Sequence, residues 1–98
     1  MSVSIETINC GDSLKAENLD ALYARLLMSL ANGKQVALDC SDLDYIDTPA
    51  LQMLAAFSKE AAIHGQAVIW EKTSEVFQKN LSLLGLEQVM QTNNTELV

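Results

Sequence analysis

The stretch that most constrains the fold runs from residue 36 to residue 64, where an apolar segment, a polar turn and a long helical pattern follow one another. Residues 36–38 form a continuous apolar run, which predicts a central strand covered on at least one face. A polar turn follows at 39–45, and from Thr48 onward the apolar residues recur with helical spacing. A strand that leads into a helix in this way favours an α/β fold.

Similar alternation continues through the rest of the chain, as expected for one domain over residues 1–98 with an at least partly parallel sheet. We expect further strands at 3–8, 67–70 and 89–90 and further helices at 16–31 and from a cap at Thr73 or Ser74 to Gly85. The inner stripe of this last helix should be Val76, Phe77, Leu81 and Leu84. Residues 91–98 are polar and aperiodic, which predicts a loose tail.

Pro49 gives a hypothesis for the start of the long helix. Proline suits the first helical position, because its missing N–H would have no intrahelical partner there, and this makes Thr48 the expected N-cap. A helix N-terminus also favours negative charge, so a phosphate on the Thr48 hydroxyl would be well placed. Thr48 is thus either a helix cap contributing about 1 kcal/mol or a phosphoacceptor.

The long helix has two apolar faces. The expected core stripe consists of Ala50, Met53, Leu54, Phe57 and Ala61. The opposite side mixes the polar Gln52, Ser58 and Lys59 with Leu51, Ala55, Ala62 and Ile63. Such a second face indicates either contact with another protein or burial under a neighbouring helix, and the pattern is compatible with both.

Four aspartates lie between positions 39 and 47: Asp39, Asp42, Asp44 and Asp47. Carboxylates could hold Mg²⁺ or Ca²⁺, but the spacing does not match an EF-hand loop, so we expect solvated turn residues and no metal site. Asp39 could also be a phosphoacceptor at a strand end, as in receiver domains. That interpretation lacks the acidic pair and the later lysine that such domains need, and the chain is short by roughly one βα unit of ~30 residues.

The composition of the chain narrows the range of possible functions. The chain has 98 residues, 49% of them hydrophobic, with a formal net charge of −7, which disfavours binding to nucleic acid or anionic membranes. We find neither a signal peptide nor an apolar span, so we expect a cytoplasmic protein without direct membrane insertion. Cys10 and Cys40 lack metal-ligand spacing and are expected to be reduced packing residues. No catalytic triad order or phosphate-binding glycine loop occurs, so we expect no catalytic residues.

The run from Asp47 to Leu51, after an apolar strand, Asp39 and Ile46, resembles the STAS domain of anti-sigma factor antagonists, whose corresponding run is Asp-Ser-Ser-Gly-Leu. The resemblance extends over nearly the whole chain, because the same domain also accommodates Gly33, Gly65 and the Leu-Leu-Gly-Leu run at 83–86. The resemblance implies an α/β, single STAS-like domain with a small mixed, mostly parallel sheet and about three to four α-helices. Pro49 and Ala50 depart from the family run.

The resemblance places the family's phosphorylated serine on Thr48. We therefore expect a non-enzymatic regulatory module that needs no cofactor and whose partner binding is switched by phosphorylation of Thr48. The expected partner-binding residues are Asp47, Thr48, Pro49, Leu51, Gln52 and Ala55. The implied partner is an anti-sigma factor or related serine/threonine kinase-like protein. The alternatives are a constitutive subunit bound to the ATPase of a phospholipid-trafficking ABC transporter, or a regulator in chemotaxis.

Overall fold

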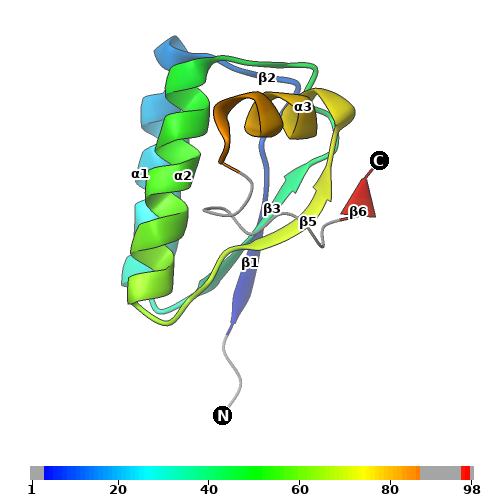
Figure 1. The fold of residues 1–98 in the computed structure, drawn as a ribbon. Helices are drawn as coiled ribbons and strands as arrows, with labels where there is room; N and C mark the ends of the chain where they lie inside the picture. Colours follow the sequence, from blue (N-terminus) through cyan, green and yellow to red (C-terminus); the bar gives the residue numbers. More distant parts are fainter. Residues whose placement is uncertain (1–3, 87–95, 98) are drawn as a thin grey trace.

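A computed structural model describes residues 4–86 and 96–97 of the chain. Strands and helices alternate along these residues, as the sequence predicts (Figure 1). The elements are β1 (Ile5–Asn9), β2 (Ser13–Leu14), the short 3-10 helix η1 (Ala16–Asn18), α1 (Leu19–Ala31), β3 (Gln35–Cys40), β4 (Tyr45–Ile46), α2 (Thr48–Ile63), β5 (Ile69–Thr73), α3 (Glu75–Leu84) and β6 (Glu96–Leu97). The class is α/β with three α-helices in the described residues, in line with the expected fold.

The main sheet has the order β1-β3-β5-β6, and every neighbouring pair in it is parallel. β3 lies inside the sheet, and its residues 36–38 are all buried, which confirms the expected central strand. α1 and α2 pack side by side along one side of the sheet, and α3 lies across the carboxyl ends of its strands (Figure 1). The carboxyl ends of the strands therefore face the N-terminal ends of α2 and α3.

A second, two-stranded parallel sheet pairs β2 with β4 and was not predicted. Its strands are two residues long, so they carry no periodicity that a sequence pattern could reveal. The pairing matches Ser13 with Tyr45 and Leu14 with Ile46. It holds together the two connections that follow β1 and β3, directly before η1 and α2 begin.

The core lies between the sheet and the helices, and α2 contributes to it over a broad face. Its buried residues are Ala50, Leu51, Leu54, Ala55, Phe57, Ser58 and Ala61. A helix packed against both a sheet and a neighbouring helix buries a wider arc than one that touches a single surface, and α2 also contacts α1. For Leu51 and Ala55, burial is thus the correct alternative, whereas Ala62 and Ile63 are exposed.

The C-terminal part differs from expectation in two places. In α3, Phe77 and Leu81 are buried as predicted, but Leu84 is 43% exposed because it lies at the end of the helix. Gly85 then adopts the left-handed conformation of a helix C-cap, as expected. The prediction of a loose tail is wrong for Glu96–Leu97, which pairs with Lys72 and Thr73 of β5. The strand expected at 89–90 lies outside the described residues.

Among the residues that the structure describes, no helix combines the length and apolar character needed to cross a membrane.

Candidate functional site

The N-terminus of α2 is capped by Asp47 and not by Thr48, which corrects the expected helix start. Asp47 has extended backbone angles, and its Oδ1 accepts a hydrogen bond of 3.1 Å from the backbone N–H of Ala50. Thr48 and Pro49 are the first two helical residues. Proline fits the second position as well as the first, because the N–H groups of the whole first turn lack intrahelical partners. A carboxylate at the cap also interacts favourably with the helix dipole.

The second carboxylate oxygen of Asp47 ties this terminus to another part of the chain. Its Oδ2 accepts a 2.9 Å hydrogen bond from the backbone N–H of Ala16, the first residue of η1. The backbone N–H of Asp47 in turn donates to the Leu14 carbonyl at 3.1 Å, and that of Asp44 to the Asp12 carbonyl at 3.0 Å. Asp47 therefore caps two helices at once and is held in place by the β2–β4 connection.

The structure divides the six predicted partner-binding residues into two groups. Thr48, Pro49 and Gln52 are exposed on the first turns of α2, and Asp47 beside them is half-buried. Leu51 and Ala55 are only 1% and 7% exposed, because they face the core. As placed, these two side chains cannot contact a partner on the surface, although they hold α2 in position beneath the exposed residues.

Two residues that the sequence analysis did not single out lie next to this terminus. Tyr45 of β4 is 50% exposed, and the Lys15 Nζ lies 5.7 Å from the centre of its ring. A cation at this distance from an aromatic face is attracted to it. No local sequence signal marks the pair, since only the β2–β4 pairing brings the two residues together. We define the Thr48 surface as Lys15, Tyr45, Asp47, Thr48, Pro49 and Gln52.

Two of the other aspartates of the 39–47 turn, Asp39 and Asp42, accept hydrogen bonds from residues close to them in the fold. Asp39 Oδ1 accepts hydrogen bonds from the Ser41 hydroxyl at 2.6 Å and the Ser41 N–H at 3.0 Å. These two bonds, together with the positive charge of Lys72, hold the pKa of Asp39 below its ordinary value against the opposing effect of burial. Asp42 accepts a bond from the Asn9 side chain. In the described residues, no three His, Cys, Asp or Glu side chains gather as a metal site would require.

Thr48 is exposed at the positive end of α2. Its hydroxyl makes no hydrogen bond with another described residue. His64, the one histidine of the chain, lies at the opposite end of that helix, where its Nδ1 is 3.4 Å from the Glu60 carboxylate. It is therefore not positioned to act as a base on Thr48.

A scan against protein-family models matches residues 5–92 to the family described as "Mlab, STAS domain". The match covers all the described elements except β6 and includes the whole Thr48 surface. A search of the curated proteins finds no match.

Proposed function

Because the chain belongs to the STAS domain family, we propose that it is a non-enzymatic, anti-sigma factor antagonist-like module that binds a protein partner through the Thr48 surface and releases it when Thr48 is phosphorylated. The observation that carries the proposal is that Asp47 and Thr48, neighbours at the start of α2, have different roles. Asp47 performs the capping, which leaves the Thr48 hydroxyl exposed and available for modification.

Capping of α2 by Asp47 and phosphorylation of Thr48 are compatible with one another. A phosphate on Thr48 would not remove the cap, because the bond from the Ala50 N–H ends on Asp47. The free N–H groups and the dipole of α2 also tolerate added negative charge. Phosphorylation should therefore leave the fold of the domain intact while it changes the surface.

Phosphorylation of Thr48 would, by contrast, weaken the contact with a bound partner. A phosphate adds roughly −1.5 to −2 charges at neutral pH, here directly beside the Asp47 carboxylate. Burying these like charges together in an interface is penalised by repulsion and by the loss of hydration. The proposed partner is an anti-sigma factor or a related serine/threonine kinase-like protein. The module itself would act without a cofactor.

The test compares Thr48→Glu with Thr48→Ala in partner capture from the native cell, with the recovered chain analysed by intact mass. Partner recovery should fall at least tenfold for Thr48→Glu, equivalent to ~1.4 kcal/mol, and stay near wild type for Thr48→Ala. Thr7→Glu is the matched control, because Thr7 is exposed on β1, which does not contribute to the Thr48 surface. A fraction of the wild-type chain carrying one phosphate on Thr48 would support the phosphorylation step of the proposal. Equal capture by the Glu and Ala variants would refute the switch.

A constitutive role is the second candidate, and the family run itself favours it. Pro49 and Ala50 replace the Ser-Gly of the regulated antagonists, and Ala50 is completely buried. In that case the Thr48 surface would hold the ATPase of a phospholipid-trafficking ABC transporter permanently. Capture of an ATPase by a chain that carries no phosphate would support this role over the switch. Capture of chemotaxis proteins would instead place the module in that pathway.

A further inference from the structure

The two cysteines, which are 30 positions apart in the sequence, lie side by side in the fold. Cys40 ends β3, and Cys10 directly follows β1, the neighbouring parallel strand. The backbone N–H of Cys10 donates to the Asp39 carbonyl at 3.1 Å, which extends the pairing of the two strands by one residue. The two Sγ atoms are 3.4 Å apart, and both cysteines are free thiols.

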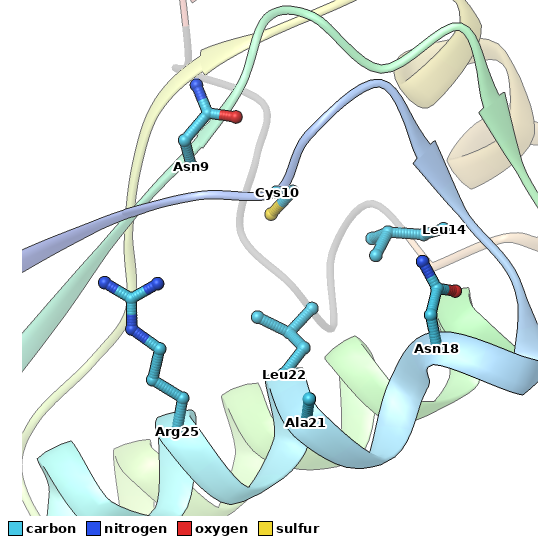
Figure 2. Close-up of a pocket in the computed structure, with 7 residues that line it drawn as sticks. All are labelled: Asn9, Cys10, Leu14, Asn18, Ala21, Leu22 and Arg25. Atoms are coloured by element: carbon cyan, nitrogen blue, oxygen red, sulfur yellow. The ribbon is translucent and has the colours of Figure 1, made fainter.

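One of the two sulfurs can be reached from solvent. Cys10 is 7% exposed and lines a surface hollow of about 250 Å³ between the end of β1 and α1. Figure 2 shows its sulfur turned toward α1, whose Leu22 side chain points toward it, with Arg25 and Asn18 at the two sides of the hollow. Cys40 has no exposed surface and is not among the residues that line the hollow. A small molecule that enters the hollow therefore meets Cys10 first.

We propose that Cys10 and Cys40 form an oxidisable dithiol, in which a small disulfide reacts at Cys10 and Cys40 then closes an intramolecular disulfide. The Cys10 thiol loses its proton to solvent, and its sulfur attacks the small disulfide. This forms a mixed disulfide at Cys10 and releases one thiolate. Cys40 then loses its proton and attacks the Cys10 sulfur, which forms the Cys10–Cys40 bond and expels the second thiolate. In total, two protein thiols are oxidised and one small disulfide is reduced to two thiols.

The order of the two steps follows from the contacts of the sulfurs. The Cys40 S–H donates its hydrogen bond to the Cys10 sulfur, which leaves Cys10 as the acceptor nearer to solvent. This bond and the burial of Cys40 raise the pKa of the Cys40 thiol well above its ordinary value. Cys40 is therefore protonated until Cys10 has reacted, and it is poised to resolve the mixed disulfide rather than to start the reaction.

The backbone allows the bond to close. A disulfide needs an S–S distance of about 2.05 Å, so the two sulfurs must approach by roughly 1.3 Å from their present 3.4 Å. Cys10 lies beyond the last residue of β1 and is followed by Gly11, which has a positive φ of 80°. A residue that follows the end of a strand and precedes a glycine can accommodate the small backbone shift that closing the disulfide requires. The dithiol is independent of the proposed switch, because it uses no residue of the Thr48 surface.

The first arm of the experiment uses the unmodified full chain under native conditions, with hydroxyethyl disulfide as a small uncharged probe. The expected product is a monomer that has lost two hydrogen atoms, retains no half of the reagent and no longer reacts with iodoacetamide. Trypsin cleaves after Lys15, Lys34 and Lys59, so the new bond should link peptides 1–15 and 35–59. This arm requires no mutation and decides the proposal even if a variant fails to fold.

The second arm separates the roles of the two sulfurs. Cys40→Ser should accumulate a stable mixed disulfide at Cys10, because no second thiol can displace the reagent. Cys10→Ser should remain unmodified while folded, as judged by circular dichroism, and react only in urea. The proposal is overturned if the folded wild-type chain stays reduced while the urea-unfolded chain is oxidised. It is also overturned if the wild type retains the mixed adduct or forms only linked dimers.

Discussion

Asp47 and Thr48 are neighbours with separate roles, and the side chains explain why. The Asp47 carboxylate has two oxygens, and each accepts from a different helix end, Oδ1 from the Ala50 N–H and Oδ2 from the Ala16 N–H, whereas a threonine side chain has a single oxygen. The sequence rule that places proline at the first helical position predicted the wrong cap by one residue. The predicted position of the hydroxyl was nonetheless correct, since Thr48 does lie exposed in the first turn of α2.

This division predicts that substitutions at the two adjacent positions affect stability to different degrees. Asp47→Ala should lower the free energy of unfolding by about 1–2 kcal/mol, because α2 loses its cap and η1 loses the acceptor of its first N–H. Thr48→Ala should stay within about 0.5 kcal/mol of the wild type, as expected for an exposed side chain without a partner. Urea unfolding followed by circular dichroism measures both. A larger loss for Thr48→Ala than for Asp47→Ala would return the capping role to Thr48.

The hydrogen bonds of Asp39 predict that the stability of the fold decreases at low pH. Because the bonds from Ser41 lower the pKa of Asp39 in the folded state, its carboxylate stabilises the fold above the unfolded-state value of 3.8. This contribution should be lost as the pH falls from about 5 through the folded-state pKa. Asp39→Asn keeps an oxygen acceptor but cannot titrate, so the stability advantage of the wild type over this variant should be smaller at about pH 3 than at about pH 6. A stability difference that is the same at about pH 3 and pH 6 would contradict the assignment.

The long elements could be predicted from the sequence because each carries a strong periodic or continuous apolar signal. The central strand and α2 were placed to within about two residues at each end, and the Gly85 cap was recognised from the residue type. β2 and β4 were missed because two-residue strands contain no period. The burial of Leu51 and Ala55 remained undecided because it depends on the tertiary packing of α2, which no local sequence pattern reveals.

The start of α3 gives a prediction for an element. Ser74 was one of two expected caps, and its Oγ accepts a 3.1 Å bond from the Phe77 N–H in a buried setting. Ser74→Ala should therefore lower the free energy of unfolding by ~1 kcal/mol, measured by urea unfolding. Ser82→Ala, on the exposed face of the same helix, is the control and should change stability by less than about 0.5 kcal/mol. Equal effects would show that the Ser74 bond does not hold the helix start.

At the scale of the whole molecule, the features that the sequence did not reveal are those made by distant residues. Cys10 and Cys40 carry no spacing signal, yet the parallel register of β1 and β3 brings their sulfurs to 3.4 Å. Lys15 and Tyr45 meet only because β2 pairs with β4. The sequence therefore located the helix terminus of the candidate site, whereas the neighbours that complete the site came from the fold.

The hydrogen bonds around Asp47 also determine when the Thr48 surface comes into being. Its backbone N–H, its Oδ2 and the nearby Asp44 N–H are each bonded to groups more than 30 positions away, in the 12–16 segment. None of these bonds can form within an isolated α2, so the surface is created only when the first and middle thirds of the chain have come together. Any protein that recognises this surface should therefore bind only chains in which residues 12–16 have already packed against residues 44–47.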